Sequence, residues 1–175
     1  MKFLLIVSSA AILSLFLNCN KKQPNPEFPL SLKLRILNNQ GQEVTNIQQG
    51  QNFTLSFILV NNTSILYFLK SMDATNLFSV YATDNGKTLV GKPWKTIFCQ
   101  YTNGYPIPAH DTTKFEIPWQ PDTTKSYLPF CLLSKTMPLA AGDYQTGFSS
   151  NFILINGNQT IQSESQTFNI NFEIK

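Results

Sequence analysis

Apolar and polar residues alternate with a period of two along most of this chain of 175 residues. In the last such stretch Phe168, Ile170, Phe172 and Ile174 alternate with polar residues. Successive side chains of a β-strand point to opposite faces, so this period predicts strands with one buried face. Similar stretches or short apolar runs occupy residues 30–36, 53–60, 65–69, 77–81, 88–90, 115–119 and 144–155.

Turn signals separate these stretches. Asn38-Asn39-Gln40-Gly41, Asp84-Asn85-Gly86-Lys87 and Asn156-Gly157-Asn158 combine asparagine with glycine, which adopts positive φ at little cost. Together they predict seven to nine short strands and less than about 15% helix. An antiparallel two-sheet β-sandwich is the economical way to bury such a set, so we expect an all-β sandwich over residues 30–175.

The segment 93–138 is the irregular part of the predicted domain. It contains seven of the ten prolines and both cysteines of the domain. We expect long loops there, with one helical turn near residues 123–127.

The N-terminus has the pattern of an export signal. Lys2 precedes an apolar run at residues 3–17, which is shorter than the roughly 20 residues of a membrane span. The end of this run and the two residues after it, Leu15-Phe16-Leu17-Asn18-Cys19, resemble a lipobox, although Phe16 stands where leucine is usual. This resemblance implies a lipoprotein signal peptide at residues 1–18 and a lipid, including palmitate, on Cys19. The alternatives are an ordinary secretory signal with an incidental cysteine, or an uncleaved anchor.

Residues 19–29 have the composition of a tether. Pro24, Pro26 and Pro29 fall within six residues, and no apolar period is present. We therefore expect a protein anchored through its lipid to a membrane of the bacterial cell envelope, with the outer membrane favoured over the inner.

Cys99 and Cys131 are the remaining cysteines. An even number in an oxidising compartment favours a disulfide between them. Two buried thiols that never meet are the alternative, and neither cysteine has the CxxC spacing of a redox or zinc site.

The charge pattern argues against nucleic acid as a partner. All 10 acidic residues lie from Glu27 onward, and of the 13 basic residues Lys2, Lys21 and Lys22 precede it, which leaves ten of each sign. A nucleic-acid-binding domain carries a clustered basic face, and this domain shows none.

Several motifs resemble known β-sandwich families. Leu139-Ala140-Ala141-Gly142-Asp143-Tyr144 resembles the start of strand F in immunoglobulin-like domains, where the tyrosine hydroxyl bonds back to the corner. Thr146 stands where a true immunoglobulin domain has cysteine. The order of strands and turns from residue 53 to 117 is similar to the β-sandwich segment of deuterolysin-like metalloproteases and to BsuPI-type proteinase-inhibitor domains.

Catalytic motifs are absent from the sequence. His110 is the one histidine, so no His-Glu-x-x-His zinc motif can form, and Gly-x-Ser-x-Gly is also absent. We predict no enzyme activity, no cofactor and no metal site.

Binding is the function class that remains. Trp94, Tyr101, Tyr105 and Trp119 lie in or beside the irregular segment, where aromatic residues can anchor a partner. The two tryptophans fit the core better, yet Trp94 stays with Tyr101 and Tyr105 as a possible binding surface. We expect a non-catalytic interaction module of the envelope. A proteinase inhibitor that uses a loop of residues 94–109, or a carbohydrate-binding module, is the alternative.

Overall fold

A computed structural model describes residues 27–84, 86–100 and 103–175. The predicted signal peptide at residues 1–18, the predicted lipid site Cys19 and the candidate binding residue Tyr101 lie outside the described residues. Within the described part the chain forms strands, turns and loops, and no helix is present that could cross a membrane.

The described residues form fourteen strands. The first seven are β1 (Leu30–Leu37), β2 (Asn46–Ile47), β3 (Thr54–Asn61), β4 (Tyr67–Met72), β5 (Val80–Ala82), β6 (Thr88–Gly91) and β7 (Trp94–Ile97). The others are β8 (Tyr105–Ile107), β9 (Asp111–Pro118), β10 (Phe130–Leu133), β11 (Gly142–Ser150), β12 (Phe152–Asn156), β13 (Gln159–Gln162) and β14 (Gln166–Ile174).

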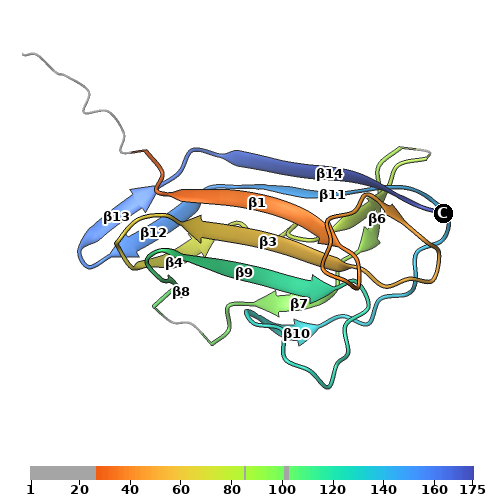
Figure 1. The fold of residues 1–175 in the computed structure, drawn as a ribbon, viewed down its shortest axis with the longest axis horizontal. Helices are drawn as coiled ribbons and strands as arrows, with labels where there is room; N and C mark the ends of the chain where they lie inside the picture. Colours follow the sequence, from red (N-terminus) through yellow and green to blue (C-terminus); the bar gives the residue numbers. More distant parts are fainter. Residues whose placement is uncertain (1–26, 85, 101–102) are drawn as a thin grey trace, which may run out of the picture.

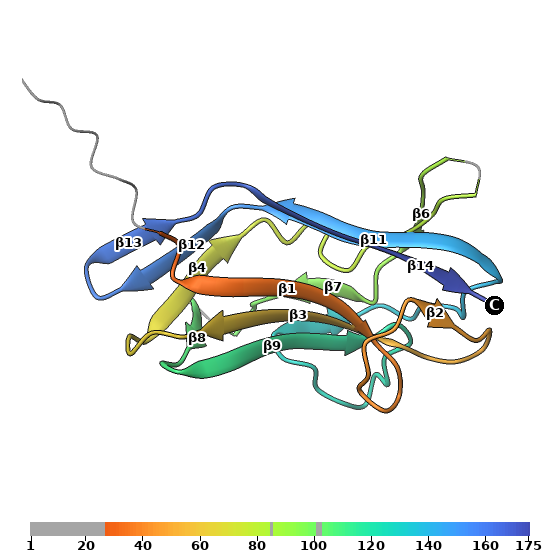
Figure 2. The ribbon, with the colours of Figure 1, turned by 45° about the horizontal axis from the view of Figure 1, so that its top comes forward.

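These strands confirm the predicted all-β sandwich. One layer has the antiparallel order β1-β3-β9, and the other has the order β2-β14-β11-β5-β6, in which only β2 pairs in parallel with β14. The order β13-β12-β4-β8 continues the second layer, because β12 follows β11 and β14 follows β13 after short breaks. In Figures 1 and 2, β11 and β14 run alongside the layer of β1, β3 and β9.

Two local predictions need correction. The stretch 144–155 contains two strands, because the strand pairing is interrupted at Asn151. After this interruption the Phe152 N–H donates to Ser163 Oγ over 2.9 Å. Such breaks raise the number of strands above the predicted seven to nine. The helical turn predicted near residues 123–127 is wrong. Lys125 N–H donates to the Asp122 carbonyl in a β-turn, and Thr124 N–H donates to Asp122 Oδ1.

Phenylalanine rings from both layers fill the core. Phe57 of β3 lies at the centre and is fully buried. Its ring centroid lies 5.1 Å from that of Phe148, 5.2 Å from Phe168, 5.8 Å from Phe152 and 6.4 Å from Phe115. Burial of such rings supplies most of the hydrophobic stabilisation of a sandwich.

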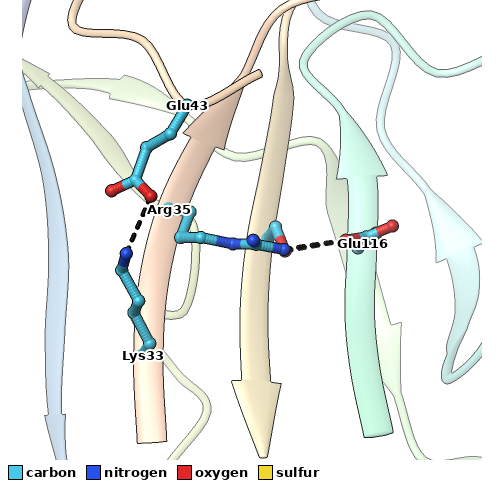
Figure 3. A network of polar contacts seen from close by, with 5 residues as sticks. Lys33, Arg35, Glu43 and Glu116 are labelled. Carbon is cyan, nitrogen blue, oxygen red and sulfur yellow. Dashed lines mark hydrogen bonds and ion pairs between the residues drawn. The ribbon is translucent and has the colours of Figure 1, made fainter. Parts of the chain in front are cut away.

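A polar network lies on the outer face of β1, β3 and β9 (Figure 3). Ser56 of β3 is fully buried between Arg35 and Glu116, and its hydroxyl donates to Glu116 Oε1 over 2.8 Å. The Arg35 guanidinium lies 3.4 Å from Ser56 Oγ and 3.7 Å from Glu116 Oε1. Long charged side chains therefore cover the small residue at the middle of this face.

The two ends of the sandwich differ. The described chain begins beside β12 and β13, where the Phe28 ring packs on Phe152 with centroids 6.1 Å apart. We call this the tether end. The opposite end carries the C-terminus, β6 and the end of β9 (Figure 1).

Candidate binding groove

A groove of about 450 Å³ lies at the end of the sandwich opposite the tether end. It runs between β6 and the irregular segment 134–140, and we call it the Trp119 groove. Its lining is Val90, Gly91, Lys92, Trp119, Ser134, Lys135, Thr136, Met137, Pro138, Leu139, Ala140 and Tyr144.

Trp119 forms the floor of the groove. It follows β9 directly, is 2% exposed, and stacks on Phe53 with centroids 6.0 Å apart. Its indole Nε1–H donates to the Met137 carbonyl over 2.8 Å, and the Thr136 hydroxyl bonds to the Trp119 carbonyl. A single core residue therefore holds the segment that forms one wall.

Two further bonds fix that wall. Ser134 N–H donates to the Pro93 carbonyl over 2.9 Å, and the Tyr144 hydroxyl donates to the Ala140 carbonyl over 3.0 Å. The second bond is the one that the immunoglobulin-like resemblance implies. Burial, and to a smaller extent the negative charge of Asp84, raise the pKa of Tyr144, so the hydroxyl stays protonated and able to donate. The wall is thus held at several points before any partner arrives.

Apolar side chains stand open on both walls. Val90 on β6 is 46% exposed, and Met137 on the opposite wall is 73% exposed. Gly91 brings the backbone of β6 close to the floor, since a Cβ there would lie 3.9 Å from the Trp119 ring. Exposed apolar residues around a concave, mostly apolar site are typical of a binding surface.

The charge of the groove is positive. Lys92 and Lys135 line it, and none of its lining residues is acidic. Lys92 Nζ donates to the Thr75 carbonyl over 2.9 Å and lies 3.9 Å from the Trp94 ring centroid. Partial burial lowers the pKa of Lys92. An apolar group that carries a carboxylate would match this lining.

The structure places two of the candidate binding residues, and it corrects the prediction for Trp94. Trp94 is 4% exposed, and its indole Nε1–H donates to the Leu77 carbonyl over 2.9 Å inside the core. Tyr105 is half-buried and packs edge-on against Phe115 with centroids 4.9 Å apart. The Trp94 ring therefore lies in the core, whereas part of Tyr105 remains exposed.

Cys99 and Cys131 lie at disulfide distance, with their Cα atoms 6.2 Å apart. Cys99 follows β7 and Cys131 lies in β10, and these two strands pair with each other. The pair therefore joins the two sides of a short ladder beside the groove wall.

His110 is exposed in the turn before β9, where its backbone N–H donates to the Thr63 carbonyl. Among the described residues no three histidine, cysteine or acidic side chains gather into a possible metal site. Of the groove residues, the sequence motifs include Trp119, Leu139, Ala140 and Tyr144, but no motif predicts that they line a groove. The neighbouring apolar residues Leu89 and Val90 are the signal that the sequence offers: a strand with period two exposes at least one of two consecutive side chains, and here both are exposed.

Comparison with protein-family models, with curated proteins and with solved structures found no match.

Proposed function

We propose that this protein is a lipid-anchored, non-catalytic binding module of the bacterial envelope, and that its Trp119 groove takes up a partner. The observation that carries the proposal is the prearranged groove, with Val90 and Met137 exposed on its walls and two lysines beside them. A preformed site loses little entropy on binding, which favours affinity.

The lining suggests what the partner offers. A volume of about 450 Å³ accepts one or two large apolar side chains rather than a whole domain. Lys92 and Lys135 favour a carboxylate next to those side chains. The partner we propose is accordingly a protein segment in which an acidic residue lies beside apolar ones.

A capture experiment with matched variants tests the binding proposal. Met137→Lys places a charge on the groove wall at a side chain that is 73% exposed, so the fold should be unaffected. Leu132→Lys is the control, because Leu132 is 57% exposed and does not line the groove. We expect a discrete envelope protein to be captured by wild type and by the Leu132 variant, and lost from the Met137 variant. Equal capture by all three would contradict the proposal.

The anchor rests on the sequence of the N-terminus: the apolar run at residues 3–17, the lipobox-like residues before Cys19 and the proline-rich tether. Cys19→Ala should leave the precursor uncleaved or release the protein from the membrane fraction, and should abolish palmitate labelling. Unchanged partitioning with an unlabelled wild type would show that Cys19 carries no lipid.

The two alternatives have direct tests. A proteinase inhibitor should block at least one enzyme of a protease panel, and a carbohydrate-binding module should bind on a glycan array. Within the segment 94–109, which an inhibitory loop would use, Trp94 is buried in the core and Tyr105 packs against Phe115. The groove therefore has the better geometric support.

A further inference from the structure

A second apolar surface lies at the tether end. Ile65 and Leu66, in the loop between β3 and β4, are 39% and 45% exposed. Next to them Phe68 of β4 pairs with Ile155 of β12 on one side and with Pro106 of β8 on the other. Phe68, Ile155 and Pro106 are half-buried, whereas Tyr67 and Leu69, on the inward face of β4, are buried. We call these five residues, Ile65, Leu66, Phe68, Pro106 and Ile155, the tether-end apolar surface.

The segments that carry this surface contain no charged residue. Residues 61–69, 103–109 and 152–163 include no aspartate, glutamate, lysine or arginine, and the charges that come next in the chain, Lys70, Asp111 and Glu164, are exposed at the borders of these segments. Moving a charge out of water is costly, so an uncharged surface can enter a headgroup region that a charged one would avoid. An ordinary solvated face of a sandwich would carry lysines and glutamates here.

The position of the surface is also informative. The loop with Ile65 and Leu66, and the β12–β13 hairpin, lie at the same end of the molecule as Glu27 (Figures 1 and 2). Glu27 follows Cys19 by eight positions. Eight residues span at most about 29 Å even when fully extended. A lipid on Cys19 would therefore keep this end of the domain within reach of the bilayer.

We propose that the tether-end apolar surface rests in the headgroup region of the membrane, with Ile65 and Leu66 inserted. This inference rests on the proposed lipid anchor. It orients the domain, because the Trp119 groove at the opposite end then faces away from the bilayer. The partner of this surface is the lipid, while the partner of the groove is a protein.

Depth-dependent fluorescence quenching tests the orientation. Leu66→Trp places an indole on the proposed membrane surface, and Leu89→Trp places one at the opposite end, where Leu89 is 59% exposed. The native Trp94 and Trp119 are 4% and 2% exposed and give a constant background. The mature lipidated protein is bound to vesicles of phosphatidylethanolamine and phosphatidylglycerol. These vesicles contain a lipid with a doxyl group near the headgroup end of its acyl chain.

We expect the Leu66→Trp protein to lose emission and shift to the blue, while the Leu89→Trp protein does neither. Amides of residues 62–69 should also exchange hydrogen more slowly on vesicles than in solution, in wild type and not in Ile65→Ser/Leu66→Ser. Melting temperatures establish that each variant is folded.

Three other outcomes overturn the inference in different ways. If the lipidated protein sediments with vesicles but neither indole is quenched, the proposed lipid anchor stands and the proposed orientation is refuted. A chain that carries no palmitate and stays in the supernatant refutes the anchor and the orientation together. If the emission of the indole at position 66 changes with protein concentration in the absence of vesicles, the tether-end apolar surface binds a second copy of the chain instead of lipid.

Discussion

The proximity of Cys99 and Cys131 gives the most quantitative prediction. Their strands β7 and β10 pair with each other as a sheet of two strands within the described residues, and an isolated pair of that kind is marginally stable in water. A covalent link should therefore contribute much of what holds this part of the chain. The Cα separation of 6.2 Å falls within the range that a disulfide requires.

The magnitude follows from the sequence separation of 32 residues. Closing a loop of that length lowers the entropy of the unfolded chain, which corresponds to about 4 kcal/mol at room temperature in the chain-entropy model. For a domain of this size 1 kcal/mol corresponds to roughly 2–4 °C in melting temperature, so we expect a loss of about 7–15 °C.

Calorimetry of wild type with and without reductant, and of Cys99→Ser/Cys131→Ser, measures the effect. The reduced wild type and the double variant should melt at similar, lower temperatures. Native protein that was never reduced should also resist thiol alkylation. Two freely alkylated thiols in that protein, or a double variant that melts with wild type, would refute the reasoning.

Three further predictions concern side chains that form hydrogen bonds. Tyr144→Phe removes the hydroxyl that donates to the Ala140 carbonyl and should cost about 1 kcal/mol of stability, measured by chemical denaturation, and it should speed amide exchange in the groove wall. Ser56→Ala should cost about 1 kcal/mol in the same assay, because Glu116 loses a donor in a part-buried network; no change would mean that water replaces the hydroxyl. The Thr124 hydrogen bonds hold the pKa of Asp122 below its usual value of 3.8, so the stability this carboxylate contributes is present above that value and is lost as the pH falls through the lower folded value. In Asp122→Asn the melting temperature should therefore fall less steeply as the pH is lowered below about 4 than in wild type. The same pH dependence in both proteins would contradict a stabilising role of the Asp122 carboxylate.

The alternation of period two was enough to predict the fold class and the longest strands. Residues 30–36 and 53–60 correspond to β1 (Leu30–Leu37) and β3 (Thr54–Asn61) within one residue. The break between β11 and β12 could not be predicted in the same way. It depends on the hydroxyl of Ser163, which lies eleven positions from Phe152 and accepts its N–H. A local pattern does not contain the identity of such a distant partner.

The candidate site was harder to predict than the fold. Its lining comes from four separate parts of the chain: β6, the residue after β9, the segment 134–140 and the start of β11. Only the start of β11 carries a local motif, the tyrosine corner at Tyr144. Trp94 and Trp119 look equivalent in the sequence, and both are buried. Only Trp119 has the groove above it, because its indole donates to the Met137 carbonyl and its own carbonyl accepts from the Thr136 hydroxyl.

Site-specific photo-crosslinking in intact cells tests the central claim most directly. A photoreactive residue in place of Met137 stands on the groove wall, and one in place of Leu132, which is also exposed, is a control outside it. The account predicts a discrete protein adduct of the membrane-bound form from position 137, weakened by Lys92→Glu/Lys135→Glu, and none from position 132. Absence of an adduct at position 137, or the same adducts from both positions, would contradict the claim that the Trp119 groove is the binding site of an anchored interaction module.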